Sequence, residues 1–233
     1  MVLEQDFSEL SDTFISLLYA QSTMNKRACI IANSPQFEVQ ESFEHAKKAD
    51  LIIAADGAAK KLHSDLKPHI ICGDFDSMDF DECVKLFPRA EWIRDTCQET
   101  NDLEKCIKLA LSRGATDIGI LCAQGGRLDH SLVTLSILER YHRDANIEFW
   151  CGQMVSRVFS AAEQEIAVPA AAGDTISLIP RSDGAILTLS GVRWPLKREL
   201  LSSGSRGVSN LALQDTVHLT VHSGVVFFVM GRE

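Results

Sequence analysis

The chain has 233 residues, of which 45% are hydrophobic and 24% are charged, and its formal net charge is −9 at pH 7. This composition is typical of a folded globular protein and excludes a disordered chain, while the acidic balance argues against nucleic acid and anionic membranes as general partners. No apolar run approaches the roughly 20 residues that a transmembrane helix needs. The sequence therefore predicts one large or two modest domains that bind neither nucleic acid nor a membrane.

Residues 1–24 form an N-terminal extension with its own pattern. The segment begins with acidic residues, whereas a secretory signal begins with basic ones, so an export signal is not expected. Apolar side chains recur at alternating four- and three-residue steps, at Leu3, Phe7, Leu10, Phe14 and Leu17. This spacing predicts an amphipathic helix that docks on the rest of the chain or on a partner. The alternative is an upstream start codon, with Met24 beginning the functional chain.

Between residues 25 and 152, apolar runs alternate with helical patterns, such as the helix-like residues 58–63. This alternation predicts βαβ units and a mainly parallel sheet flanked by helices. In such sheets, ligands bind outside the carboxyl ends of the strands. Four of the apolar runs are followed by polar clusters: 51–55 by 56–57, 70–73 by 74–77, 92–93 by 101–105, and 117–123 by 124–130. We therefore expect one crevice that collects Asp56, Asp74, Asp76, Asp102, Arg127 and Asp129.

Asp74 and Asp76 follow the apolar run at residues 70–73 directly. Folding gains nothing from two negative charges at the end of a buried strand unless a cation lies between them. A hard divalent cation that takes oxygen ligands, with Mg²⁺ as the first choice, meets this need. The alternative is turn chemistry, in which short side chains bond their own backbone.

The helix after Asn101 has recognisable ends. Asn101 is a suitable N-cap with Glu104 in the capping-box position, and Gly114 can adopt the left-handed conformation that ends a helix. A buried stripe follows the helical period: Leu103, Cys106, Ile107, Ala110 and Leu111. Asp102 and Lys105 lie on one face of the first turn. They form either a surface salt bridge, worth at most about 1 kcal/mol, or part of the expected crevice.

Gly125, Gly126 and Arg127 lie between a strand and a helix whose expected N-cap is Asp129. Paired glycines expose backbone N–H groups, a helix start adds partial positive charge, and arginine can bind a phosphate through two parallel hydrogen bonds. Together these features suit a polyphosphate, although two glycines before a helix are common in α/β proteins. Neither the P-loop motif nor the dinucleotide-binding Gly-x-Gly-x-x-Gly motif is present.

The seven cysteines show no Cys-x-x-Cys pair and no metal-ligand spacing. Most of them lie in apolar runs as small hydrophobic residues, which favours reduced thiols and a cytoplasmic location. After about residue 152 the pattern changes to short apolar strands separated by Gly, Asp, Ser and Pro. This change predicts a C-terminal all-β sandwich domain that begins near Gln153.

Six blocks of the sequence, in the same order, resemble the thiamine pyrophosphokinase family. They are residues 55–57, 73–77, 101–105, 125–130, 194–196 and 209–210. No single block is decisive, whereas the ordered set, within a likeness that extends from about residue 27 to residue 230, is specific. The resemblance implies an α/β domain at residues 25–152 that binds ATP and metal, and a β-sandwich at residues 153–233 that binds thiamine. It also implies a homodimer with shared active sites, which transfers pyrophosphate from ATP to thiamine and releases AMP.

The resemblance also implies roles for residues on the ATP side. Asp74, Asp76 and Asp102 look like the Mg²⁺-binding carboxylates, and either Asp102 or Asp76 would accept the proton of the thiamine hydroxyl. Lys105 and Arg127 are similar to the groups that hold the phosphates. The other positions of this set are Asp56, Gly57, Ser77, Asn101, Gly125, Gly126, Asp129 and His130.

On the thiamine side, the resemblance implies Trp194, Ser209 and Asn210. The ring face of Trp194 would attract a cationic heteroaromatic substrate through stacking and cation–π interaction, and Trp194 would come from the partner chain. Without the resemblance, a position in the hydrophobic core is equally open to this tryptophan. Three positions depart from the family's pattern and put the detailed geometry of the metal site in doubt: Glu99, Asn101 and Thr134.

Two other functions stay open at this point. The block at Asp74 also resembles the nucleophile loop of haloacid-dehalogenase-type phosphatases, in which the first aspartate is phosphorylated. That loop normally follows the first strand of the fold, whereas at least two strand-like runs precede Asp74. The second alternative is a non-catalytic sensor of nucleotide or thiamine that has kept the binding pocket.

Overall fold

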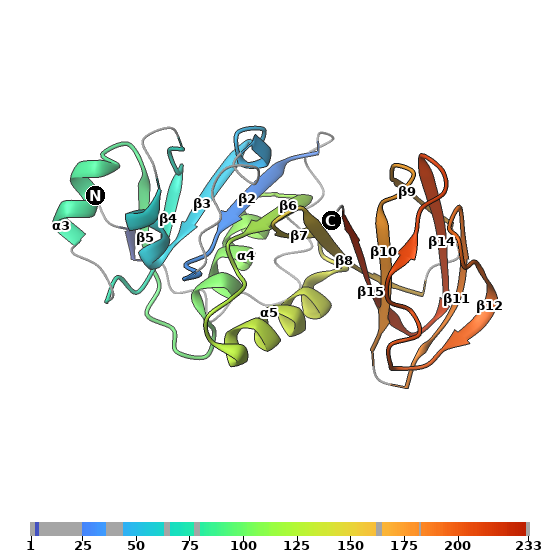
Figure 1. Ribbon diagram of the computed structural model, residues 1–233. Helices are drawn as coiled ribbons and strands as arrows, with labels where there is room; N and C mark the ends of the chain where they lie inside the picture. Colours follow the sequence, from blue (N-terminus) through green and yellow to red (C-terminus); the bar gives the residue numbers. More distant parts are fainter. Residues whose placement is uncertain are drawn as a thin grey trace. The chain divides into compact units, whose positions relative to one another are not determined.

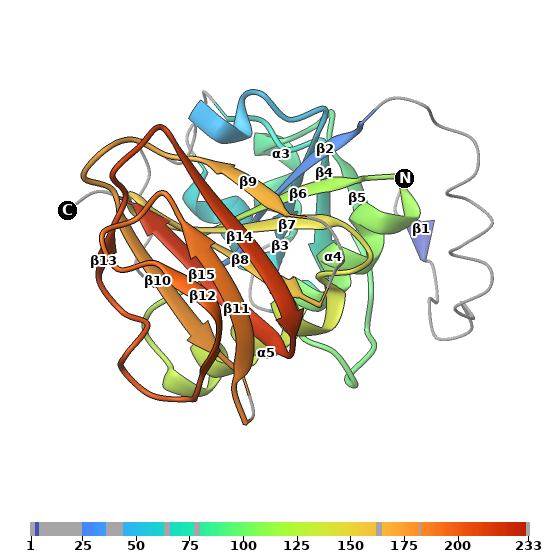
Figure 2. The same ribbon diagram turned by 90° about the vertical axis from the view of Figure 1, so that its right-hand side faces the viewer.

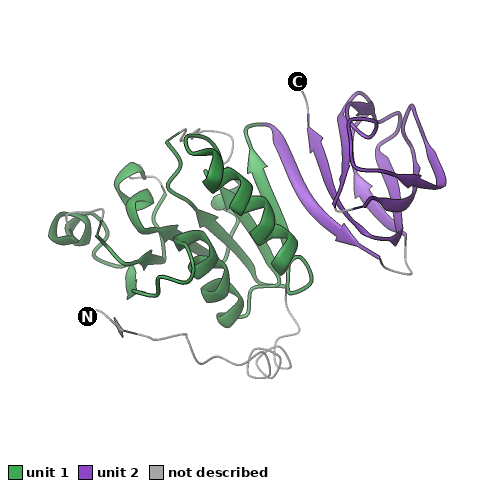
Figure 3. Cartoon of the chain, turned by 90° about the horizontal axis from the view of Figure 1, so that it is seen from below, with its two compact units in different colours: residues 1–152 green, residues 153–233 purple. Residues whose placement is uncertain are grey.

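A computed structural model describes residues 3–4, 25–35, 44–62, 66–76, 80–161, 165–181 and 183–231. The chain divides into two compact units, residues 1–152 and residues 153–233 (Figure 3). Unit 1 is an α/β structure and unit 2 is an all-β structure, which confirms the predicted fold class. Among the described helices, none is long and apolar enough to cross a membrane.

Unit 1 contains a parallel sheet. Its strands are β1 (Leu3–Glu4), β2 (Arg27–Ile31), β3 (Leu51–Ala55), β4 (Ile70–Gly73), β5 (Glu91–Arg94), β6 (Asp117–Leu121) and β7 (Asn146–Cys151). They are arranged in the order β1-β5-β4-β3-β2-β6-β7, and every neighbouring pair is parallel (Figure 1). The chain builds outward from β2 to β5 on one side and then crosses to β6 on the other. The point between β2 and β6, where the direction reverses, is where such sheets bind ligands.

Both faces of this sheet are covered, which explains why β3 is buried along its whole length. One face packs Ile31, Ile52 and Ile71 against Ala58 and Phe87. Helix α4 (Asp102–Ser112) packs against β2, β3 and β4. The remaining helical elements of the unit are the 3₁₀ helix η2 (Asp56–Lys61), α3 (Phe80–Leu86) and α5 (Leu128–Tyr141).

The predicted helix after Asn101 is confirmed in most details. The Asn101 side chain accepts a hydrogen bond from the Glu104 backbone N–H at 2.9 Å, and Gly114 follows the helix with φ of +80°. The five residues of the predicted stripe are all buried. The capping box is wrong on one point, because the Glu104 carboxylate accepts a hydrogen bond from the Tyr141 hydroxyl at 2.8 Å. Tyr141, which is distant in the chain, therefore binds the Glu104 side chain that the capping-box pattern assigns to the start of the helix.

Three further local predictions need correction or lie outside the described residues. The helix-like segment after β3 is a 3₁₀ helix, and His63 is not among the described residues. Helix α5 has Arg127 in the N-cap position, whereas Asp129 lies in its first turn. Within the N-terminal extension the structure describes only Leu3–Glu4, which form a strand parallel to β5. The predicted amphipathic helix otherwise falls outside the described residues.

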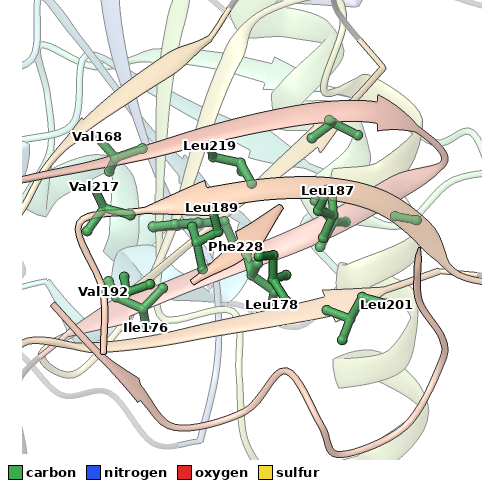
Figure 4. Close-up of a cluster of buried hydrophobic side chains, with 14 of the residues drawn as sticks. Val168, Ile176, Leu178, Leu187, Leu189, Val192, Leu201, Val217, Leu219 and Phe228 are labelled. Atoms are coloured by element: carbon green, nitrogen blue, oxygen red, sulfur yellow. The ribbon is translucent and has the colours of Figure 1, made fainter. Parts of the chain in front are cut away.

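Unit 2 is a sandwich of two sheets. Its strands are β8 (Met154–Ser160), β9 (Ile166–Pro169), β10 (Thr175–Pro180), β11 (Ala185–Ser190), β12 (Leu196–Leu201), β13 (Asn210–Leu211), β14 (Thr216–Ser223) and β15 (Val225–Gly231). One sheet has the order β8-β15-β10-β13 and the other β12-β11-β14-β9, with antiparallel pairing (Figure 2). The inner faces meet in one apolar core, where Leu178 and Phe228 come from the first sheet and Leu187 and Leu219 from the second (Figure 4).

Candidate active site

Three carboxylates meet beyond the carboxyl ends of β3 and β4. One oxygen from each of Asp56, Asp74 and Asp76 lies within 4.8 Å of the other two. The structure thus groups three of the five carboxylates that were expected in one crevice. Asp102, at the first position of α4, is outside this group of three, but its carboxylate is close enough to interact electrostatically with Asp56 and Asp74.

The backbone around the three carboxylates is unusual. Asp56 has φ of +38° and Phe75 has φ of +62°, conformations that residues with a side chain rarely adopt. The Phe75 N–H donates to Asp56 Oδ1 at 3.2 Å, and the Asp76 N–H donates to Asp74 Oδ1 at 3.2 Å. A Cβ added to Gly73 would lie 2.7 Å from the Asp56 Cβ. The bond from the Asp76 N–H to the Asp74 carboxylate is the side-chain-to-backbone turn that the sequence offered as an alternative. Here this turn occurs within the loop that brings the carboxylates together.

The cluster is electrostatically unfavourable without a cation. The negative charge of Asp74 is the main cause that raises the pKa of Asp76 above its ordinary value. Burial is the main cause that raises the pKa of Asp102, and Lys105 opposes this shift. Repulsion between carboxylates and removal from water both disfavour the charged form of an acid. A bound cation would reverse both effects, so these groups fit a metal site.

Lys105 provides a buried positive charge beside the cluster. Lys105 is only 4% exposed. Its Nζ donates to the Asp95 carbonyl oxygen at 3.0 Å and to Asp102 Oδ1 at 3.4 Å. The alternative of a surface salt bridge between Asp102 and Lys105 is therefore wrong, because Lys105 is buried. A charge in such a place acts through a lower effective dielectric than a charge at the surface.

A cavity of about 310 Å³ lies at the switch point of the sheet. Five of the sequence-predicted residues line it: Asn101, Asp102, Gly125, Arg127 and His130. Asn33 and Ser34, on the loop after β2, also line it and were missed from the sequence. The signal was present, because the apolar run at residues 27–31 is also followed by small polar residues. Of the remaining predicted positions, Gly57 is buried in η2, and Ser77 lies outside the described residues.

Gly125 lines this cavity, and its neighbour Gly126 lies where two loops approach each other. Gly126 has φ of +77°, and a Cβ added there would lie 2.5 Å from Pro35 Cγ, so a glycine lets this loop approach the loop after β2. The Ser34 hydroxyl donates to the Gln124 carbonyl oxygen across the same junction. Arg127 and Asp129 are both exposed and form a two-point ion pair, with Arg127 Nε 3.1 Å from Asp129 Oδ1. The hydrogen bond from Arg127 is the main cause that lowers the pKa of Asp129 to about 2.

A second cavity, of about 560 Å³, lies within unit 2. Trp194, Ser209 and Asn210 all line it, as the resemblance implies, together with leucines from the sandwich core. Trp194 is 55% exposed, so its placement in the hydrophobic core is wrong. The Arg193 guanidinium carbon lies 4.9 Å from the centre of the Trp194 ring. A cation therefore already lies over one face of the indole.

Comparison with protein families gives matches in both units. Residues 43–150 match the model for the catalytic domain of thiamin pyrophosphokinase. Residues 163–226 match the model for its vitamin B1 binding domain. The two matched segments together cover more than half of the chain, and they follow the order of the α/β unit and the β-sandwich.

Individual relatives agree with the family models. Thiamine pyrophosphokinase 1 of Arabidopsis thaliana is 26% identical, over 94% of this chain and 91% of the relative. The fold is similar to that of thiamine pyrophosphokinase from Bacillus subtilis, with a TM-score of 0.79 and 23% identity over 89% of this chain and 100% of that one. The Candida albicans enzyme gives a TM-score of 0.75 and 19% identity over 90% of each chain. The chain therefore belongs to the thiamine pyrophosphokinase family.

Proposed function

We propose that this thiamine pyrophosphokinase binds ATP and Mg²⁺ at the carboxyl edge of the sheet in unit 1, and thiamine in the Trp194 cavity of unit 2. The observation that carries the first assignment is the meeting of Asp56, Asp74 and Asp76 beside the buried Lys105. The alternating acidic and basic groups suit a nucleotide whose phosphates and metal must be held together. The aromatic face of Trp194 supports the second assignment, since it suits a cationic ring.

The donor set fits Mg²⁺ by its chemistry. Carboxylate oxygens are the hard ligands that this ion prefers, and Mg²⁺ usually binds through one or two carboxylates together with substrate phosphates and water. Asp74, Asp76 and Asp102 would hold the ion, with Asp56 as a further acidic neighbour. When bound, Mg²⁺ neutralises negative charge on phosphate oxygens. The absence of cysteine and histidine ligands from the group of three carboxylates argues against a softer metal.

The positive groups of unit 1 would hold the phosphates. Lys105 would act as a fixed buried charge, and Arg127 would offer a planar pair of donors. Backbone N–H groups of Gly125 and Gly126, next to the start of α5, would add partial positive charge. The other proposed contacts on this side come from Asp56, Gly57, Ser77, Asn101, Asp129 and His130. Asn33 and Ser34 line the same cavity, and we add them to this set.

The reaction needs one bond to form and one to break. The thiamine hydroxyl oxygen bonds to the β-phosphorus of ATP, and the bond from this phosphorus to the oxygen bridging to the α-phosphorus breaks, so that AMP leaves. The hydroxyl proton passes to a carboxylate, for which we propose Asp102, with Asp76 as the alternative. A raised pKa, as burial produces at Asp102, makes a carboxylate a stronger base. Lys105 stabilises the charge that develops on the phosphate oxygens.

The phosphatase alternative is disfavoured by the order of the strands. Asp74 follows β4, and both β2 and β3 precede β4 in the chain. In the dehalogenase-type arrangement the nucleophile follows the first strand. The sensor alternative shares the binding groups and is separated from the enzyme only by turnover.

We further propose that the chain acts as a homodimer with shared active sites, in a reducing compartment such as the cytoplasm. All seven cysteines are free thiols, which supports the compartment. The family resemblance supports the dimer. Mixing the variants Asp76→Asn and Trp194→Ala tests the sharing, because a mixed dimer would then have one site with both changes and one with neither. Activity restored above that of both variants is expected, and no restoration would contradict shared sites.

The central experiment is incubation of the full chain with ATP, thiamine and Mg²⁺, with the products identified by mass. Equal amounts of AMP and thiamine diphosphate are expected. Omitting thiamine should abolish AMP release, which controls for hydrolysis. Binding of ATP and thiamine without AMP release over hours would favour the sensor, and inorganic phosphate with a phosphorylated Asp74 would favour the phosphatase.

A further inference from the structure

The backbone of Trp194 is held by a side chain. The segment before it pairs in antiparallel fashion with the segment at β13: Val192 forms a bridge with Ala212, and the Arg193 N–H donates to the Leu211 carbonyl oxygen at 2.9 Å. At the next position the Asn210 side-chain amide binds the backbone of Trp194, accepting from the Trp194 N–H at 3.0 Å and donating to the Trp194 carbonyl oxygen at 2.8 Å.

In this register Val192 with Ala212, and therefore Trp194 with Asn210, are non-hydrogen-bonded pairs, so the β13 backbone would leave the Trp194 N–H and carbonyl without a bond. The Asn210 side chain supplies both bonds instead. The next residue, Pro195, has no N–H and cannot continue the pairing. Trp194 is 55% exposed, so packing in the sandwich core does not hold it. The position of the indole therefore depends strongly on the backbone bonds that Asn210 supplies.

The amide of Asn210 is largely used by these contacts. Its Oδ1 also accepts from the Leu211 N–H at 2.9 Å, which occupies the second lone pair. Ser209, which precedes it with φ of +64°, donates its N–H to the buried Ser177 hydroxyl of β10 at 3.1 Å. A chain of bonds thus runs from the sandwich through Ser209 and Asn210 to Trp194. Asn210 lines the cavity but retains only one amide hydrogen for a ligand.

We infer that Asn210 is a positioning residue, which fixes Trp194 so that its ring meets the cationic substrate, and that it does not itself recognise the substrate. The inference rests on the proposed function, because it takes thiamine as the ligand of this cavity. Holding a recognition group in its bound geometry raises affinity by removing the entropy loss of ordering it on binding. Loss of this support weakens thiamine binding and leaves the ATP side unchanged.

The test combines kinetics with a direct probe of Trp194 in the full chain. The three tryptophans, at positions 92, 150 and 194, are replaced by 5-fluorotryptophan, and Trp194→Phe assigns the fluorine resonance of Trp194. In Asn210→Ala, this resonance should shift or broaden, whereas those of Trp92 and Trp150 should not. The KM for thiamine should rise about tenfold, while the KM for ATP and kcat stay within about twofold of the wild-type values.

Two further variants keep the result interpretable. Asn210→Asp keeps an acceptor for the Trp194 and Leu211 N–H groups but loses the donor to the Trp194 carbonyl oxygen, so its Trp194 resonance should also shift or broaden, and this variant serves if the alanine variant fails to fold. Asn146→Ala, at an exposed position in unit 1, should change neither readout. A raised thiamine KM with an unchanged Trp194 resonance would overturn the inference in favour of direct contact. An unchanged thiamine KM in Asn210→Ala would overturn the inference as well. A wild-type chain without turnover would instead refute the proposed function, and the fluorine resonance would still test whether Asn210 holds Trp194.

Discussion

The proposed sites of the two units are built on opposite principles. In unit 1, the charged side chains Asp56 and Lys105, each 4% exposed, are placed by the end of β3 and by the first turn of α4. In unit 2, the principal side chain, Trp194, is 55% exposed, and hydrogen bonds from Asn210 hold its backbone. The first site concentrates charge at an energetic cost. The second presents an aromatic ring, and the neighbouring Asn210 amide is already hydrogen-bonded to the backbone.

This difference shows what each cavity requires from its ligand. Crowded carboxylates gain stability when a cation binds, so nucleotide binding at the site in unit 1 should depend on metal. Among the described residues that line it, the cavity in unit 2 has no cluster of carboxylates to neutralise. Its affinity for thiamine should therefore depend on its shape and on the Trp194 ring. We therefore expect changes in unit 1 to act on catalysis and metal dependence, and changes in unit 2 to act on the KM for thiamine.

The largest expected effect comes from Asp76→Asn. Removing one of three clustered carboxylates should lower kcat by about 100- to 1,000-fold and should raise the Mg²⁺ concentration needed for half-maximal rate. The measurement is AMP formation at saturating thiamine over a range of Mg²⁺ concentrations. Asp81→Asn, which removes the same charge from the exposed start of α3, should leave both values nearly unchanged. Near-normal turnover of Asp76→Asn would remove the carboxylate cluster from the mechanism.

Trp194→Ala tests the other side of the comparison. Loss of the ring face should raise the KM for thiamine by about 2- to 30-fold, the range that corresponds to a cation–π interaction of about 0.5–2 kcal/mol. The KM for ATP and the Mg²⁺ dependence should not change. Leu213→Ala removes another exposed apolar side chain of unit 2 and should affect neither constant. If Trp194→Ala changed the Mg²⁺ dependence, the division between the two cavities would be wrong.

A pair of glycine substitutions tests the loop strain in unit 1. Gly73→Ala should move Asp56, because the added Cβ would lie 2.7 Å from the Asp56 Cβ. We expect a loss of about 1–3 kcal/mol in the free energy of unfolding, as for an overpacked core, and a fall of several-fold in kcat. Gly119→Ala, in the parallel strand β6, would place its Cβ 3.9 Å from the nearest neighbouring atom and should be tolerated. Denaturant unfolding and steady-state kinetics compare the two, and equal behaviour would argue against the steric role of Gly73.

The smallest effect concerns the exposed pair Arg127 and Asp129. The pKa of Asp129 is lowered from 3.8 to about 2, so the stability that this pair contributes is present above about pH 4 and is lost as the pH falls through about 2. The difference in unfolding free energy between wild type and Asp129→Asn should therefore be constant from pH 5 to pH 8 and should shrink below pH 4. Urea unfolding at several pH values measures it. A difference that varied around neutral pH would assign the dependence to another group.

Local sequence signals predicted much of unit 1 because they reflect local physics. The N-cap at Asn101 and the buried stripe of α4 depend on neighbours within a few residues, and both are present. The N-cap expected at Asp129 was wrong because its carboxylate is engaged by the side chain of Arg127 and by the His130 N–H. Two acceptable cap positions lie close together there, and local preference does not separate them.

The sequence by itself determined that strands alternate with helices and that acidic residues follow the strands. Both features depend only on the order of neighbouring residues, through the spacing of hydrophobic side chains and the position of polar loops. Only the tertiary structure decided which strand ends became neighbours. It placed β2 between β3 and β6, so that Ser34 meets Gln124 and the missed loop at Asn33 lines the cavity. Likewise Glu104 is bonded by Tyr141, and Trp194 by Asn210. These choices depend on distances between residues far apart in the chain, which no local pattern records.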